Sequence, residues 1–216
     1  MPHDPAMTFR TTDGQTIRVR QMLPADVNLL VDIFHNLSED SIYQRFREPT
    51  AQLSPLRVLE EARALAQAGY SQGKGFLAFA DLPGRRGAPV AGIRYIRTGD
   101  DVAEVAITVR DDFQQKGIGT QLLGILIDEA RQDGIHHLVA HVSANNRAAL
   151  KLLRRYPFPQ RRTYDGSEMT IQFDISEKTL IPPDAPLRTA REPNRKPRSR
   201  PGHSARTAAS VPWDKK

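Results

Sequence analysis

One segment restricts the fold more than any other part of the chain, because a strand, a glycine loop and a helix follow one another directly. An apolar run covers Val102–Val109, the loop carries Gln-x-x-Gly-x-Gly over residues 114–119, and an amphipathic pattern covers about 118–133. Glycines let backbone approach a ligand closely, and a helix start presents unpaired N–H groups and a positive dipole end. The segment therefore predicts an anion site suited to a pyrophosphate.

The loop differs from two widespread phosphate-binding loops. No Gly-Lys-Ser/Thr sequence follows it, which excludes a Walker A loop. The third glycine of a dinucleotide-binding fingerprint is also missing. A Gly-x-Gly pair alone is weak evidence, since it occurs at flexible helix starts, and it is the strand before it and the helix after it that make the pattern specific.

Residues 1–176 predict one mixed α+β domain, with a mostly antiparallel, twisted sheet of about six to seven strands and about four flanking helices. Strands are expected at residues 9–11, 16–20, 76–80, 90–96, 102–109, 137–142 and 169–175. Helices are expected after Pro24, after Ser38, from Ser54-Pro55, over about 118–133 and from Asn145 or Asn146 to about Arg155.

The composition excludes several classes of protein. No stretch approaches the roughly 18 consecutive apolar residues that a membrane helix needs, and the N-terminal residues MPHDPAMTFR lack an apolar signal region. Cysteine is absent, which excludes disulfide scaffolds, Cys-ligated zinc, iron–sulfur clusters and thiol nucleophiles. We therefore expect a cytoplasmic protein.

The basic charge of the chain lies in its C-terminal residues. Residues 177–216 hold 10 of the 31 Lys and Arg residues but only 4 of the 25 Asp and Glu residues, which leaves 21 of each in residues 1–176. This segment also carries 7 of the 16 prolines and no apolar periodicity. We expect a disordered tail, which is either a solubilising end or a weak arm for nucleic acid or another anionic partner.

The Gln-x-x-Gly-x-Gly loop resembles the acetyl-CoA-binding motif of the GNAT superfamily of N-acetyltransferases. The segment Val142-Ser143-Ala144-Asn145-Asn146-Arg147 resembles the strand–Asn–helix element of the same superfamily. Three further stretches resemble the acetyltransferase domain of bacterial protein-lysine acetyltransferases. These are the entry around Asp13-Gly14, Leu37–Phe46, and the Glu-bearing strand Ala103–Val109. The resemblance implies a GNAT fold and acetyl-CoA as co-substrate, with no metal.

The resemblance also implies roles for individual residues. Glu104 matches the general base of the family. The backbone of Ile107, Thr108 and Val109 would pair with the pantetheine arm, and Asn146 would contact that arm or brace the strands. The loop residues that would hold the pyrophosphate are Gln114, Gln115, Lys116, Gly117, Ile118, Gly119 and Thr120. The residues expected on the acceptor side are Tyr43, Arg45 and Phe46.

Two positions depart from the superfamily pattern. Leu153 stands where many members have the tyrosine that protonates the leaving thiolate, and Tyr156-Pro157-Phe158 replaces a usual Leu-Gly-Phe. A proline there changes the exit of the last helix.

Ordinary structural roles are open for several of these residues. Glu104 would otherwise be a solvated charge at a strand edge, Lys116 a solvated surface charge, and Tyr43, Arg45 and Phe46 packing and surface residues. His137 and His141 share a strand face, but about 13 Å separates them, which is too far for one metal ion.

The favoured function is direct acetyl transfer from acetyl-CoA to a primary amine, above all a protein lysine. A lysine amine has a pKa of about 10.4, so its neutral form costs about 4–5 kcal/mol at pH 7, and a carboxylate that takes the proton removes this obstacle. The alternatives are a small-molecule amine acceptor, and a non-catalytic acyl-CoA-binding module.

Strand alternation puts Glu104, Ala106 and Thr108 on one face, and Val105, Ile107 and Val109 on the other.

Overall fold

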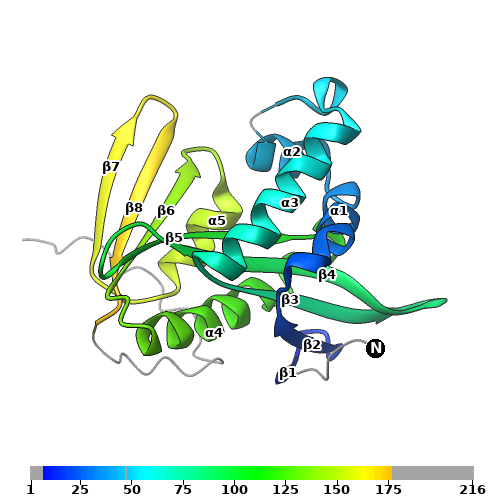
Figure 1. Ribbon diagram of the computed structural model, residues 1–216, viewed down its shortest axis with the longest axis horizontal. Coiled ribbons are helices and arrows are strands. Elements are labelled where there is room, and N and C mark those ends of the chain that lie inside the picture. Colours follow the sequence, from blue (N-terminus) through cyan, green and yellow to red (C-terminus); the bar gives the residue numbers. More distant parts are fainter. Residues whose placement is uncertain (1–6, 47, 177–216) are drawn as a thin grey trace, which may run out of the picture. The chain divides into compact units, whose positions relative to one another are not determined.

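The computed structural model describes residues 7–46 and 48–176, and a mixed sheet forms its centre (Figure 1). The sheet has eight strands in the order β1-β2-β3-β4-β5-β6-β8-β7, and all neighbours are antiparallel except β5 and β6. The strands are β1 (Met7–Arg10), β2 (Thr16–Gln21), β3 (Gly73–Leu82), β4 (Arg85–Arg97), β5 (Val102–Val109), β6 (His137–Ser143), β7 (Gln160–Asp165) and β8 (Glu168–Asp174).

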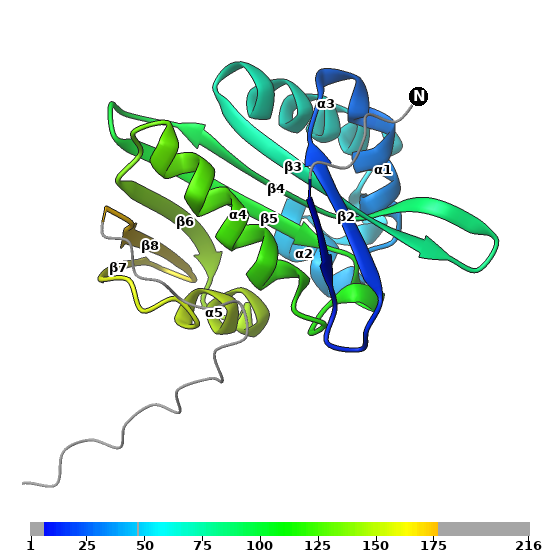
Figure 2. The same cartoon turned by 90° about the horizontal axis from the view of Figure 1, so that it is seen from below.

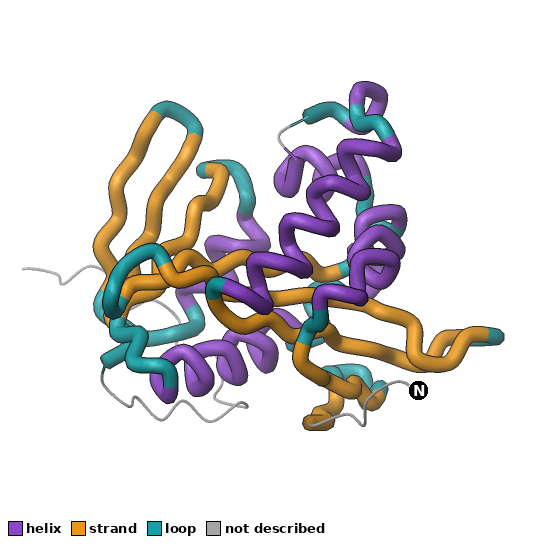
Figure 3. The backbone as a smooth tube through the Cα atoms, in the orientation of Figure 1, coloured by secondary structure: helices purple, strands orange, loops and turns teal. Residues whose placement is uncertain are grey.

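Five α-helices accompany the sheet, and Figure 3 colours the helical segments purple against the orange strands. They are α1 (Val27–His35), α2 (Glu39–Phe46), α3 (Pro55–Ser71), α4 (Ile118–Gln132) and α5 (Arg147–Arg154). Short 3₁₀ turns cover Pro24–Asp26, Thr50–Gln52 and Asp111–Phe113. The predicted α+β class and the mostly antiparallel sheet are confirmed. The predicted tail, residues 177–216, lies outside the described residues.

The sheet has one strand more than the predicted six to seven, and the five helices exceed the predicted total of about four although each lies at a position expected from the sequence. The strand that the sequence did not reveal is β7, which pairs with β8 at the edge of the sheet. Its residues Gln160–Asp165 are polar and almost wholly exposed. Because such a strand buries nothing, it lacks the apolar alternation by which strands are recognised.

The helices cover both faces of the sheet, and each face has its own core. Figure 2 shows α4 lying across β3, β4 and β5. Its residues Leu122, Leu126 and Ala130 are fully buried there. On the opposite face, Leu30 and Ile33 of α1 and Leu65 of α3 pack with Met22 and Leu77. The sheet therefore presents β5 to two separate layers of helices.

The helix boundaries follow the predicted caps. Ser54 Oγ accepts a hydrogen bond from Arg57 N at 3.2 Å, with Pro55 at the first helical position of α3. Asn146 Oδ1 accepts from Ala149 N at 3.0 Å and starts α5. Gly134 follows α4 with a left-handed φ of 75°, which a glycine adopts without strain. Within the described ranges, the chain forms no helix with the length and apolar character required to span a bilayer.

Candidate functional site

The strands β5 and β6 run parallel for only three residue pairs and then separate. Pairing joins Val102–Glu104 to His137–Val139 and stops there, although both strands continue. Along its other edge, β5 pairs with β4 as far as Val109. The backbone of residues 105–109 therefore has no partner strand on the β6 side, and Figure 1 shows β6 turning away from β5. An extended ligand can add to such an edge by main-chain hydrogen bonds.

Helix α4 begins beside this free edge. Its N-cap is Gly117, whose φ of 87° lies in the left-handed region that suits glycine. A Cβ on Gly119 would lie 3.6 Å from Ile107 of β5 and 3.4 Å from Leu152 of α5, so the first turn packs between these two elements. The unpaired N–H groups and the positive end of α4 therefore stand where β5 and β6 part.

Side chains of the loop before α4 point in several directions. Gln114 Nε2 donates to Val109 O at 3.2 Å and to Ser41 Oγ at 3.3 Å, which fixes the loop against β5 and α2. Lys116 Nζ lies 3.0 Å from Asp13 Oδ2 and 5.1 Å from the centre of the Phe113 ring. Gln115 is exposed and has a φ of 59°. Any ligand at this loop would meet mainly backbone.

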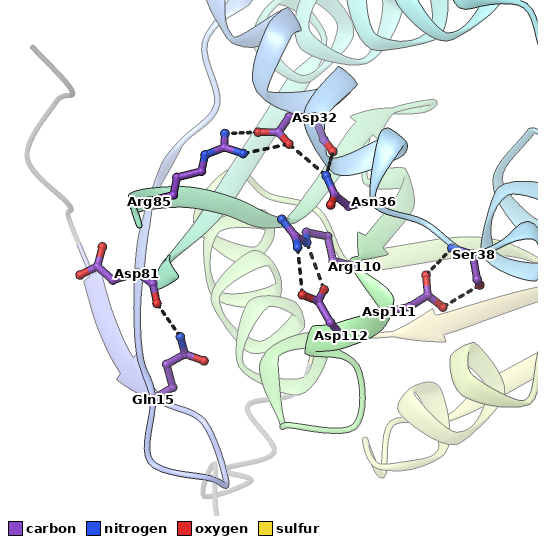
Figure 4. A network of polar contacts seen from close by, with 9 residues as sticks. All are labelled: Gln15, Asp32, Asn36, Ser38, Asp81, Arg85, Arg110, Asp111 and Asp112. Atoms are coloured by element: carbon purple, nitrogen blue, oxygen red, sulfur yellow. Dashed lines mark hydrogen bonds and ion pairs between the residues drawn. The ribbon is translucent and has the colours of Figure 1, made fainter. Parts of the chain in front are cut away.

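The same loop holds the start of α2 through one carboxylate. Asp111 Oδ2 accepts from Ser38 N at 2.8 Å, and Asp111 Oδ1 accepts from the hydroxyl of Ser38 at 2.8 Å (Figure 4). Asp111 Oδ1 also accepts from the hydroxyl of Ser41 at 2.9 Å. Ser38 Oγ in turn accepts from Ser41 N at 3.3 Å, as its predicted capping role requires. Hydrogen bonds from Asp111 therefore connect the glycine loop to the start of α2, and the sequence did not reveal this contact.

The predicted alternation along β5 holds. Val105, Ile107 and Val109 pack with the core that contains α4. Ala106 and Thr108 instead line a cavity on the opposite face, beneath α1 and α3. Glu104 belongs to this second set and is half-buried. No residue in the described part of the chain forms a hydrogen bond or ion pair with its carboxylate, so Glu104 is an unengaged acceptor beside the free edge of β5.

Two arginines lie in the same cavity. Arg45 of α2 and Arg94 of β4 both line it, together with Phe34, Gly92 and Thr108. Arg45 Nη2 donates to Glu61 Oε1 at 2.6 Å. Burial lowers the pKa of both guanidiniums, and the charge of Glu104 acts in the opposite direction on each. The sequence did not single out Arg94, although a lone arginine inside the apolar run at 90–96 could have revealed it.

The three residues expected on the acceptor side lie in different environments. Arg45 lines the cavity. Phe46 is buried, with its ring edge-on to Phe34 at a centroid distance of 5.2 Å, so it packs in the core. Tyr43 is 46% exposed on the outer side of α2. The structure therefore brings only Arg45 near Ala106 and Thr108.

Two asparagines at the end of β6 have different partners. Asn146 uses its side chain as the α5 cap described above. Asn145 Oδ1 accepts from Ser143 Oγ at 2.8 Å and from Gln44 Nε2 of α2 at 2.9 Å. The Gln44–Asn145 hydrogen bond joins the two sides of the opening between β5 and β6, and it is a second contact that the sequence did not reveal.

Of the residues that depart from the superfamily pattern, Leu153 and Tyr156 pack in the core that contains α4, whereas Pro157 is exposed. Leu153 is buried in that core. Tyr156 lies after the end of α5, and its hydroxyl donates to Thr120 O at 2.5 Å. Burial raises the pKa of this phenol, so the hydroxyl keeps its proton and donates it in the hydrogen bond to Thr120 of α4. Tyr156 does not replace the tyrosine missing at position 153.

Within residues 7–46 and 48–176, no three His, Cys, Asp or Glu side chains are grouped so as to hold a metal ion. His141 Nδ1 instead lies 3.1 Å from Thr170 Oγ1, and His137 Nε2 lies 3.8 Å from Asp101.

Comparison with known proteins agrees with this geometry. Residues 37–158 match the model of the Acetyltransferase (GNAT) family. The chain belongs to the GNAT family. It is similar to Acetyltransferase Pat of Mycolicibacterium smegmatis, with 32% identity over 171 residues that cover 78% of this chain and 49% of Pat. It also resembles L-amino acid N-acyltransferase MnaT of Escherichia coli, with 37% identity over 91 residues, 38% of this chain and 52% of MnaT.

A solved GNAT structure supports the same assignment. The crystal structure of the GNAT domain of S. lividans PAT superposes with a TM-score of 0.67 at 27% identity, and the match covers 78% of this chain and 96% of that domain. The chain spans about half the length of the two curated relatives named above. The predicted likeness to the acetyltransferase domain of bacterial protein-lysine acetyltransferases is therefore confirmed at the level of the domain.

Proposed function

We propose that this GNAT domain transfers an acetyl group from acetyl-CoA directly to a primary amine, with Glu104 as the general base. The observation that carries the proposal is the unpaired edge of β5. It lies between the positive end of α4 and a face that bears the unengaged carboxylate of Glu104. A donor bound along this edge would bring its thioester beside that face.

The backbone supplies most of the contacts in this proposal. Residues 107–109 pair with the pantetheine arm, which lies as an additional strand in the opening. N–H groups of residues 115–120 bind the pyrophosphate, since a helix N-terminus favours an anion. Gly117 supports this role by its left-handed φ and Gly119 by its close approach to Ile107. Gln114 and Asn146 act indirectly, as braces of the loop and of α5.

Glu104 accepts a proton from the ammonium form of the acceptor, directly or through a water. The neutral nitrogen then attacks the thioester carbon, and a backbone N–H of β5 stabilises the oxyanion. The N–C bond forms as the C–S bond breaks, and the second proton of the nitrogen ends on the CoA sulfur. Leu153 provides no acid for that sulfur, and a thiolate leaves well enough without one.

The acceptor belongs to one of two classes. A protein lysine is the acceptor that the resemblance to protein-lysine acetyltransferases implies, and the chain is 32% identical over 171 residues to the relative named Acetyltransferase Pat. A small amine is supported by the relative named L-amino acid N-acyltransferase. The exposed Tyr43 on α2 would contact a protein acceptor, whereas the half-buried Arg45 would contact only a small group that enters the cavity.

Incubation of the full chain with labelled acetyl-CoA and a cell lysate tests the proposal. We expect acetyl-CoA-dependent release of free thiol, with label in either the protein or the small-molecule fraction. The alternative is a non-catalytic module that binds acyl-CoA. Binding of acetyl-CoA in calorimetry, without thiol release from any lysate, would favour that module and contradict the proposal.

A further inference from the structure

The guanidinium of Arg94 is held on the β5 face that carries Glu104. In the sheet, Arg94 stands opposite Ala106 of β5 and opposite Gly75 of β3. A Cβ on Gly75 or on Gly69 of α3 would lie 3.4 or 3.7 Å from Arg94 Cβ, so these two glycines leave room for its stem. The fold therefore accommodates a long cationic side chain between α3 and the sheet.

The charge of Arg94 is not neutralised by a direct contact. Its Nε and Nη1 are buried and have no hydrogen-bond partner among the described residues, and the same holds for Nε of Arg45. Arg45 nevertheless pairs with Glu61, which Arg57 also contacts at 3.3 Å. A buried donor without a partner is costly, and more so when it is charged. The guanidinium of Arg94 therefore has free donors for a hydrogen-bond acceptor that the described residues do not supply.

Glu104 is the complementary unpaired charge. It lies two residues from Ala106 on β5 and so is a diagonal neighbour of Arg94 on the same face of the sheet. The two side chains form no ion pair within 4.0 Å in the described part of the chain. The charge of Glu104 still acts on both guanidiniums through space. One negative group on β5 and one positive group on β4 are thus held apart on the same face of the sheet.

A small cavity lies beside Arg94, and Glu104 is not among the residues that line it. The cavity lined by Arg45, Arg94, Ala106 and Thr108 has a volume of about 20 Å³. This admits a group of the size of one water or one ligand oxygen. The cavity thus suits a compact polar group rather than a long chain.

We propose that the acceptor is an α-amino acid, whose carboxylate binds Arg94 while its amino group lies toward Glu104. The inference rests on the function proposed above and names its substrate class. A zwitterion carries both charges on neighbouring atoms, with the signs reversed relative to Glu104 and Arg94. A lysine side chain brings only the cation and leaves Arg94 without a partner.

The test compares acceptors that differ only in the carboxylate. The full-length chain with acetyl-CoA is given a panel of α-amino acids, the matching panel of their primary amides, and Nα-acetyl-lysinamide, and thiol release is followed. We expect kcat/KM for the best amino acid to exceed that for its amide by at least about 10-fold, because a buried site made for a charged group rejects the analogue that lacks it.

Variants of Arg94 assign the preference to that residue. Arg94→Met removes the charge and the donors but retains an apolar stem. It should lower kcat/KM at least about 10-fold more for the amino acid than for the amide, mainly through KM. Arg94→Lys keeps the charge and should recover part of the preference. Arg86→Met, an identical change at an exposed site in the β3–β4 hairpin, is the matched control.

Stability separates a substrate role from a structural one. Replacement of an unpaired buried charge by an apolar side chain is not expected to destabilise the free protein, so Arg94→Met should melt at or above the wild-type temperature. If Arg94→Met fails to fold, two measurements still test the inference. These are the ratio of kcat/KM for the amino acid to that for its amide in the wild type, and the same ratio in Arg94→Lys.

Equal rates for amino acids and amides, or equal losses for both in Arg94→Met, would overturn the inference. Acetylation of Nα-acetyl-lysinamide alone would also overturn it, yet would leave the proposed function intact. Absence of thiol release with every amine would defeat both.

Discussion

Two half-buried charges near β5 differ from the ion pairs elsewhere in the domain, because they have no direct partner among the described residues. Arg18 and Asp81 form a bidentate pair at 2.5 and 3.0 Å that joins β2 to β3. Lys74 lies 2.9 and 3.0 Å from Glu129 and Asp133. Glu104 and Arg94 have no such partner. This contrast, more than either residue type, is why we propose that this face of β5 receives the substrate.

The Arg18–Asp81 pair predicts a pH dependence of stability. The hydrogen bond from Arg18, followed by that from Gly87 N, lowers the pKa of Asp81 to about 2. Because the pKa is lower in the folded state, the pair stabilises above the usual Asp pKa of about 4 and loses its effect as the pH falls toward 2. Asp81→Asn should therefore melt slightly below wild type at pH 7, and the difference should vanish near pH 2.

Melting curves of both proteins at several pH values check this. Asp100→Asn, an exposed turn residue, is the control. A difference between wild type and Asp81→Asn that stays constant down to pH 2 would show that the carboxylate charge is not responsible.

At the scale of elements, the separation of β5 from β6 is the feature on which the site depends. Helix α4 starts at that separation, and α2 is connected to it twice, by Asp111 to Ser38 and Ser41 and by Gln44 to Asn145. Helix α2 is thus joined by polar contacts both to the loop before α4 and to the end of β6, and Figure 4 shows the contact between Asp111 and Ser38. A change in one is expected to affect the binding of both substrates.

Asp111→Asn tests this connection. The amide loses the negative charge and can accept at only one oxygen, while Asp111 now serves two serines. We expect the free energy of unfolding to fall by about 1–3 kcal/mol. We also expect KM to rise for acetyl-CoA and for the amine, because both α2 and the glycine loop are loosened.

Denaturant unfolding and steady-state kinetics measure the two effects. Asp40→Asn, at an exposed position in the first turn of α2, is the control. A loss of stability without any change in either KM would show that the network supports the fold alone.

The sequence predicted the elements that have apolar periodicity or clear caps. The helix α4, its glycine start and the alternation on β5 follow from such patterns, and so do the caps at Ser54 and Asn146. The exposed strand β7 was missed because it buries no side chain. The cavity residue Arg94 and the bridge from Gln44 to Asn145 were missed because each depends on contacts between residues far apart in the chain. Phe46 was expected to contact the acceptor because the sequence pattern does not distinguish a phenylalanine that packs in the core from one that lines a substrate site.

At the scale of the whole molecule, charge is expected to divide the chain into a neutral domain and a basic tail. Removal of residues 177–216 should change the melting temperature by less than about 3 °C, a shift that corresponds to roughly 1 kcal/mol in a domain of this length. Affinity for acetyl-CoA should stay the same, and any affinity for nucleic acid should be lost. Calorimetry and melting curves check this, and a larger fall in melting temperature would show that the tail packs on the domain.

The variant Glu104→Gln tests whether Glu104 removes the proton of the acceptor amine. The amide keeps the shape of the side chain but cannot accept the proton. Near pH 7, kcat should fall by about 100-fold or more, while acetyl-CoA affinity in calorimetry stays unchanged. The defect should shrink as the pH rises toward the pKa of the amine, where neutral acceptor is already abundant. A loss that is the same at every pH, or wild-type turnover in the variant, would contradict the account.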